Sequence, residues 1–383
     1  MSILFFVVLL GSLSMNLLSP IWPLYVSSLG ASPSQLGYII AVSNAIAAIL
    51  QIPSGLLSDR YGRKMLNAIG TFLGIFPPLL YTLARTWTDL IPWVVLNGVA
   101  TGLYLPIRWS FVADYSTPGR RAVAYSWMNI AFLLGSTVAP FAGGLVADAF
   151  GVLAPFPVCF AIMCACFGFS LLLQEPKKTR SQRPLATGSA VKTQGFLQIA
   201  IIFSALSVIQ LAGIGMYSPI TPEFMERQFT ADYTAIGILY AVGFGMSSMI
   251  VQIPGGRLTA KRSRKKTILL ATVLSSPFFG LFALSRSFFE AVLLMFLSNV
   301  ILNVSWPAYQ DLMMELTPSA HWGFMNGLSA TSSFAGMMVG SAISGVLWEG
   351  FGMFFPYYVS AVMVLLSAVP LIFLKETTDR RER

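Results

Sequence analysis

Apolar stretches separated by short polar breaks run along almost the whole sequence. A stretch of 18 or more apolar residues is long enough to cross a hydrocarbon core of about 30 Å as a helix. The breaks predict spans at 3–28, 35–57, 65–84, 90–113, 122–148, 153–173, 195–218, 232–258, 267–285, 288–313, 322–348 and 353–374. Because strand-like alternation is weak, a barrel is not favoured. The pattern predicts an all-α membrane protein with twelve transmembrane helices.

One polar and basic segment, residues 174–194, divides the chain. It separates an expected six-helix bundle at 1–173 from a second at 195–374, and a polar tail follows at 375–383. The first span lacks the basic start and short apolar core of a signal peptide, so we expect it to be retained.

Composition agrees with a membrane protein, because 56% of the residues are hydrophobic and only 10% are charged. Soluble domains carry about 25% charged residues. The net charge of +9 does not indicate nucleic acid binding, because the basic residues are spread over alternate loops. The three cysteines, Cys159, Cys164 and Cys166, lie in one apolar segment without His or acidic neighbours. We therefore expect no disulfide framework, no metal site and no cofactor.

The distribution of Lys and Arg predicts the orientation, since cytoplasmic loops are enriched in both. Of the 24 basic residues, 20 fall in alternate loops, the linker and the tail on one side. Only Arg85, Arg227 and Arg286 fall on the other side, and Arg108 lies within a span. Both termini and the linker are therefore expected in the cytoplasm, with the lipid bilayer of the cell membrane around the helices.

The sequence repeats itself at an offset of about 200 residues. The segment "LQIPSGLLSDRYGRK" (Leu50–Lys64) aligns with "VQIPGGRLTAKRSRK" (Val251–Lys265), and "SPIWP" (Ser19–Pro23) aligns with "SPITP" (Ser218–Pro222). Further along, "GLVADAFG" (Gly144–Gly151) aligns with "GVLWEGFG" (Gly345–Gly352). Two parallel repeats predict two pseudo-symmetric halves that enclose one cavity and rock to expose it to each side in turn.

The stretch "GLLSDRYGRK" (Gly55–Lys64), between the second and third spans, resembles the loop signature of major facilitator superfamily (MFS) transporters at every fixed position. The chain resembles this family over nearly its full length, and most of all its 12-span drug–proton antiporters. The resemblance implies a transporter that works by alternating access.

The signature has a physical reading in its charges. Asp59 sits at a helix C-terminus, where a carboxylate needs compensation, and Arg63 four residues later can supply it. By resemblance, Asp59, Arg63 and Asp114 form a charged cluster that latches the halves together near Trp322 and Gly323. The predicted latch comprises Gly55, Asp59, Arg60, Gly62, Arg63 and Asp114, with Arg60 and Lys64 serving mainly orientation. The second copy comprises Gly256, Arg264 and Glu315. Because Ala260 replaces the aspartate, we expect a weaker latch there, or an Arg264–Glu315 pair alone.

The fifth span reads "GSTVAPFAGG" (Gly135–Gly144) and resembles a motif of drug–proton antiporters, with Ala139 in place of its first glycine. The motif residues are Gly135, Pro140, Gly143 and Gly144. They are consistent either with kinship to exporters or with ordinary close packing of small residues between helices. The family's arginine in the fourth span is replaced here by Gly98.

Spacings of 4, 3 and 4 place Asn97, Thr101, Tyr104 and Arg108 on one face of the fourth span. Arg108 faces the cavity, where it would favour an anionic group, or it snorkels to the surface or pairs with Asp114. The full set of cavity candidates is Asn16, Trp22, Asn44, Asn97, Thr101, Tyr104, Arg108, Asn129, Gln210, Tyr217, Asn303, Trp306 and Asn326.

A secondary transporter of small molecules is the favoured function, and specifically an exporter of amphipathic, drug-like compounds that acts as a monomer. Coupling to protons is left open, since no Asp or Glu lies in the middle of a span. The alternatives are a facilitator or symporter that takes up a sugar or organic anion, and a membrane sensor. An enzyme is not expected, because one histidine and no mid-span acid leave no reacting cluster.

Overall fold

The computed structural model describes residues 1–116, 121–175, 193–261, 263–318 and 321–374. Within these residues every regular element is a helix. Most of the expected linker and the whole of the expected tail at 375–383 lie outside the described residues.

Ten helices of the described chain are long and apolar enough to cross a membrane. The other two predicted spans, the third and the sixth, are present as shorter helices. The third span consists of α4 (Arg63–Leu73) and α5 (Phe76–Tyr81). The two helices are separated at Gly74 and Ile75, and Pro77 and Pro78 lie in the first turn of α5. The sixth span is α8 (Pro155–Leu171), an apolar helix of 17 residues. The ten long helices and these two agree with the predicted twelve.

The other helices of the N-terminal half are α1 (Ser2–Leu17), α2 (Trp22–Ser28), α3 (Pro33–Tyr61), η1 (Trp87–Leu90), α6 (Ile91–Tyr115) and α7 (Arg121–Phe150). The C-terminal half begins with α9 (Thr193–Tyr217), α10 (Thr221–Phe229), α11 (Tyr233–Ile238), η4 (Leu239–Met246), α12 (Ser247–Lys261) and α13 (Arg264–Ala283). It ends with α14 (Phe288–Asn303), α15 (Ser305–Leu316), α16 (Trp322–Phe351), α17 (Phe355–Leu366) and α18 (Val369–Ile372).

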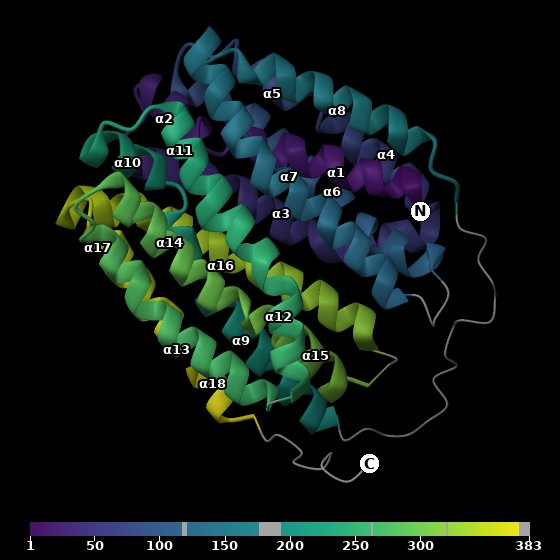
Figure 1. Ribbon diagram of the computed structural model, residues 1–383. Helices are drawn as coiled ribbons and strands as arrows, with labels where there is room; N and C mark the ends of the chain where they lie inside the picture. Colours follow the sequence, from purple (N-terminus) through teal and green to yellow (C-terminus); the bar gives the residue numbers. More distant parts are fainter. Residues whose placement is uncertain (117–120, 176–192, 262, 319–320, 375–383) are drawn as a thin grey trace.

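The two halves lie side by side, with the N-terminal half in purple and blue and the C-terminal half in green and yellow (Figure 1). They meet along two pairs of long helices: α16 packs against α3, and α7 packs against α11 and η4. We call the end that carries the N-terminus, Arg63 and Arg264 the basic end. The other end, which carries Asp148 and Glu349, is called the acidic end.

Two of the repeated motifs form matching breaks in long helices. The "SPIWP" motif ends α1 at Leu17, and α2 begins at Trp22. The "SPITP" motif ends α9 at Tyr217, and α10 begins at Thr221. Proline lacks a backbone N–H and clashes with the preceding turn, so each motif interrupts its helix. The breaks lie at equivalent places in the two halves.

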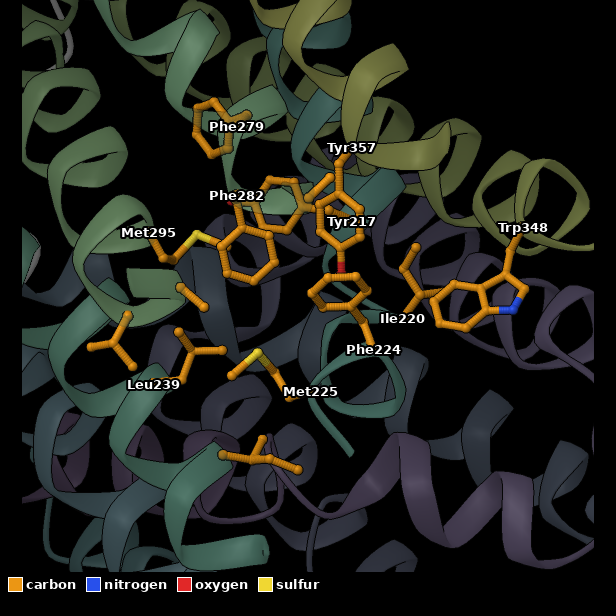
Figure 2. Close-up of a cluster of buried hydrophobic side chains, with 14 of the residues drawn as sticks. Tyr217, Ile220, Phe224, Met225, Leu239, Phe279, Phe282, Met295, Trp348 and Tyr357 are labelled. Atoms are coloured by element: carbon orange, nitrogen blue, oxygen red, sulfur yellow. The ribbon is translucent and has the colours of Figure 1, made fainter. Parts of the chain in front are cut away.

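The core of the C-terminal half is rich in aromatic rings. Figure 2 shows Tyr217, Phe224, Phe282 and Tyr357 gathered within it. The ring centroids of Tyr217 and Phe279 are 5.3 Å apart, and those of Phe224 and Tyr357 are 5.0 Å apart. Such pairs contribute roughly 0.5–1.5 kcal/mol each beyond their burial. Tyr217 was expected to face the cavity, and its side chain is buried within this cluster.

Candidate functional site

A cavity of about 300 Å³ lies beside the two helix breaks, and Ser19, Ser218 and Pro219 from the breaks form part of its wall. The remaining lining residues are Ser14, Met15, Leu18, Trp22, Pro23, Ile39, Ile40, Ser43, Asn44, Gly74, Pro78, Tyr81, Val94, Asn97, Thr101, Tyr104, Cys159, Met163 and Tyr240. Most come from the N-terminal half. None of these residues is charged, so the wall offers apolar and aromatic surface with neutral hydrogen-bonding groups.

Five of the cavity candidates line this wall: Trp22, Asn44, Asn97, Thr101 and Tyr104. The last three come from α6, and they reach the wall together because their spacing places them on one helical face. Trp22 packs against the ring of Tyr81, with 4.2 Å between the ring centroids. The cavity therefore has an aromatic corner and a row of neutral polar side chains on α6.

Several other candidates do not belong to this wall. The side-chain amides of Asn16, Asn303 and Asn326 donate to the carbonyls of Ser12, Asn299 and Trp322, each four residues earlier in the chain, at 2.8–3.0 Å. Such bonds satisfy a polar group within its own helix. Asn129, Gln210 and Trp306 are also absent from the lining, and Trp306 stacks on Tyr309.

Arg108 lies one turn beyond Tyr104 on α6 and is only 4% exposed. Its Cζ is 4.0 Å from the centroid of the Tyr104 ring, and its Nη2 donates to Cys166 Sγ at 3.3 Å. Arg108 is not among the residues that line the cavity. Its side chain does not reach the surface either, and Asp114 pairs with Arg63.

Most of the serine and tyrosine side chains in the lining could not be recognised from the sequence, among them Ser14, Ser43, Tyr81 and Tyr240. Serine and tyrosine within apolar spans are common, so their presence gives no signal. Tyr240 lies in η4, a π-helical segment in the middle of an otherwise α-helical span. Such segments often occur at functional sites. Its glycines, Gly243 and Gly245, are the only sequence features that hint at irregularity.

At the basic end, Arg63 is the centre of the predicted latch. Its guanidinium forms an ion pair with Asp114, and its Nη1 donates to the Ser110 carbonyl at 2.6 Å. The side chain of Asp59 lies outside the described residues. Arg60 is exposed, with its Cζ 5.4 Å from the centroid of the Tyr61 ring. Arg63 therefore ties the start of α4 to the end of α6 inside one half.

A residue that the sequence did not suggest completes this arrangement. The carboxylate of Glu175 accepts hydrogen bonds from the backbone N–H groups of Arg63 and Lys64, at 2.8 and 2.9 Å. It thus caps the N-terminus of α4, where negative charge is favourable. Gly62 has φ +98°, and a methyl group on it would lie 3.2 Å from the Glu175 carboxylate. The glycine therefore allows both the turn and the cap.

The second copy of the motif has a similar centre in the other half. Arg264 forms ion pairs with Asp311 and with Glu315 on α15. The pairing with Glu315 was expected and that with Asp311 was not. The expected contact point on α16 is loosely packed: a methyl group on Gly323 would meet nothing within 4 Å, and the same holds for Gly55 and Gly256. Trp322 donates instead to the carbonyls of Met314 and Thr317.

The acidic end is joined by two repeat-related carboxylates. Asp148 of α7 accepts from the backbone N–H groups of Tyr233 and Thr234 at 3.2 and 2.7 Å, at the start of α11. Glu349 of α16 accepts from the backbone N–H and hydroxyl of Ser34 at 3.0 and 2.6 Å, at the start of α3. Each half therefore caps a helix of the other half, and we call these two contacts the cross-caps.

Small residues bring the same helices into close contact. A methyl group on Gly144 would overlap the Tyr233 carbonyl, and one on Gly345 would overlap the Pro33 carbonyl. A methyl group on Gly237 would lie 2.5 Å from the Pro140 carbonyl. In the fifth-span motif, Gly135 and Gly143 pack on α1, while Pro140 and Gly144 pack on α11. The motif thus contacts both halves at once.

Glu223 of α10 is the only buried acidic residue among the side chains that the structure describes. It pairs with Arg227 at 2.5 Å and accepts from Ser27 of the other half at 3.3 Å. The repeat places Leu24 at the equivalent position in the N-terminal half. A carboxylate therefore lies at the boundary between the halves, at the acidic end.

Two repeat-related six-helix halves around one cavity define a multi-pass membrane transporter. The family model of the Major Facilitator Superfamily matches residues 4–212 and 203–383, and the chain belongs to this family. It is therefore a transporter and not an enzyme.

Relatives and solved structures resemble the chain over nearly its whole length. Multidrug resistance protein 2 of Bacillus subtilis is 22% identical, covering 98% of this chain and 96% of the relative. A quinolone resistance protein of Staphylococcus aureus is 23% identical, covering 91% of this chain and 89% of the relative. The crystal structure of a D-xylose–proton symporter has a TM-score of 0.78 at 17% identity, covering 96% of this chain and 95% of the other.

Proposed function

We propose that this transporter exports small amphipathic molecules. The observation that supports this most directly is the uncharged cavity wall, which combines aromatic and aliphatic surface with neutral donors and acceptors. Such a wall binds mainly by shape and apolar contact. The names of the multidrug and quinolone resistance relatives point the same way.

Transport follows from alternating access. With the basic end in the cytoplasm, as the positive-inside rule indicates, both termini lie in the cytoplasm and the acidic end faces outward. The halves are the bundles at 1–173 and 195–374, joined by the linker at 174–194 and acting as a monomer in the cell membrane. Cross-caps and close glycine contacts hold the outer end shut. Cargo then enters from the inside, and rocking of the halves releases it outside.

Glu223 is the candidate for proton coupling. It is buried at the boundary between the halves, where opening of the outer end separates it from Ser27 and exposes it to water. The other titratable groups near Glu223 are Glu226, Arg227 and Tyr357. An exporter driven by protons would take up a proton at Glu223 from outside.

The test is transport of a fluorescent amphipathic dye in proteoliposomes, with and without a proton gradient. Gradient-driven export is expected for the wild type. In Glu223→Gln the gradient should no longer drive export, while exchange of dye down its own gradient persists. If dye moves equally with and without a proton gradient in the wild type, the proposed proton coupling is refuted. If no dye moves at all, the proposed export function is refuted.

Uptake of a small metabolite is the second candidate, as a facilitator or a symporter. The fold similarity to a D-xylose–proton symporter and the serine, threonine and asparagine side chains of the wall favour it. A sugar makes many hydrogen bonds to such groups. Sugar-dependent protection of the cavity from thiol reagents, without any dye transport, would decide for uptake.

A further inference from the structure

The guanidinium of Arg108 lies behind the cavity wall, against a ring that lines the cavity. Its side chain is enclosed by α1, α6 and α8, and it packs against the face of the Tyr104 ring, which itself lines the cavity. A methyl group on Gly11 of α1 would overlap Nη1. The chain therefore leaves a specific space for this cation.

No anion in the described part of the chain compensates this charge. None of the described carboxylates forms an ion pair with Arg108, and its Nε has no hydrogen-bond partner. Its contacts are the Tyr104 ring and the thiol of Cys166, which is a weak acceptor. A buried charge without a partner is costly and in membrane spans usually marks a functional site.

We propose that Arg108 sets a positive potential in the cavity and makes the transporter prefer substrates that carry a carboxylate or another anionic group over matched cations. The wall itself is uncharged, so nothing in it screens this field. Arg108 thereby acts as a specificity-determining residue through the ring of Tyr104. The proposal deepens the proposed function and rests on it for the cargo.

The size of the effect follows from the distance. Seven residues separate Thr101, in the wall, from Arg108, which is about 10 Å along a helix. At an effective dielectric constant of about 20, one charge acting on another across roughly 10 Å changes binding by about tenfold. The affinity for anions should rise by this factor, and the affinity for cations should fall by it.

The first experiment measures the potential without any cargo. Thr101→Cys is made with Cys159→Ala and Cys164→Ala, keeping the fully buried Cys166. Its rates with 2-sulfonatoethyl and 2-(trimethylammonium)ethyl methanethiosulfonate are measured in detergent and divided by the rates with a free thiol. The normalised ratio should favour the anionic reagent about tenfold, drop toward one with Arg108→Gln, and persist with Arg108→Lys.

The matched control is Arg85→Gln, which removes an exposed positive charge from the same half and should leave the ratio unchanged. A merely structural role for Arg108 would alter both rates together and leave their ratio constant, which would overturn the proposal. A ratio near one in the protein with Arg108 intact would overturn it as well, even if Arg108→Gln does not fold.

The second experiment concerns cargo. Binding of rhodamine B, which carries a carboxylate, is compared with binding of its ethyl ester. The preference for the acid over the ester should fall about tenfold in Arg108→Gln. If the thiol ratio responds but neither dye binds, the potential is established and export of such dyes fails. If dyes are transported but neither ratio changes, the proposed function stands and the role of Arg108 is refuted.

Discussion

Gly11 and Arg108 are in direct contact, and the absence of a side chain on Gly11 makes room for the guanidinium of Arg108. Gly11 lies in the middle of α1, where glycine lowers helix stability by roughly 1 kcal/mol relative to alanine. Its place is explained by the guanidinium, which occupies the space of the missing methyl group. When the guanidinium of Arg108 is removed, glycine should therefore no longer be required at position 11.

Gly11→Ala should lower the stability of the protein in detergent by about 1–3 kcal/mol, because the guanidinium must leave its place. In the Arg108→Gln background the same substitution should be neutral or slightly stabilising. Thermal unfolding of the four proteins in this cycle measures the coupling. Gly168→Ala on α8, where a methyl group meets nothing within 4 Å, is the control. An equal loss of stability in both backgrounds would show that a contact other than Arg108 requires glycine at position 11.

Gly62 is a second residue whose backbone decides a local structure. Gly62→Ala should cost about 1–3 kcal/mol, because φ +98° is strained for alanine and the methyl group crowds the Glu175 carboxylate. Gly55→Ala, in open space inside α3, should cost nothing. Thermal unfolding compares the two. A loss confined to Gly55→Ala would refute this account of the loop.

At the scale of helices, caps at the acidic end fall into two kinds. Asp148 and Glu349 cap helices of the opposite half, whereas Asp89 and Glu290 accept from the backbone N–H groups of Arg85 and Arg286 in their own halves. Within each kind, the two acidic residues occupy equivalent positions in the two repeats. The first kind is broken when the halves separate, and the second kind is not.

Asp148→Asn together with Glu349→Gln should therefore shift the protein toward states that are open at the acidic end, by about tenfold in population. The reason is that hydrogen bonds to charged groups contribute roughly 1.5–3 kcal/mol, and a neutral amide retains only part of this. Distances between spin labels at Leu153 and Phe289, exposed in opposite halves, measure the opening. Asp89→Asn with Glu290→Gln is the matched control and should leave them unchanged. Similar distances in both double variants would contradict the role of the cross-caps.

The sequence predicted elements far better than their contacts. Twelve spans and the Arg63–Asp114 pair could be anticipated, because long apolar stretches and a charged loop signature are local features. The aligned segments that contain Asp148 and Glu349 were also visible. That these acids reach the opposite half was not, since a cap across halves depends on how the halves dock. The burial of Tyr217 was missed because an aromatic ring within a span suits a cavity and a core equally.

At the scale of the whole molecule, the packing between the halves is uneven along their length. At the acidic end Gly37 and Gly345 leave no room for a methyl group. Toward the basic end a methyl group on Gly327 would lie 3.9 Å from Ile52, and one on Gly323 would point into open space. The structure is thus closed at the acidic end and loose at the basic end, as expected for one extreme of a rocking motion.

Gly345→Ala should prevent full closure of the acidic end, because its methyl group would overlap the Pro33 carbonyl, which is backbone and cannot rotate away. The protein should then favour the state open at that end, and transport should fall at least tenfold while substrate binding persists. Reactivity of a cysteine at Ser218, in the cavity wall, toward a reagent added from the acidic side should rise. Gly350→Ala, five residues later on α16 with nothing within 4 Å, should behave as the wild type. Normal transport in Gly345→Ala would mean that this close contact is not needed to close the cavity.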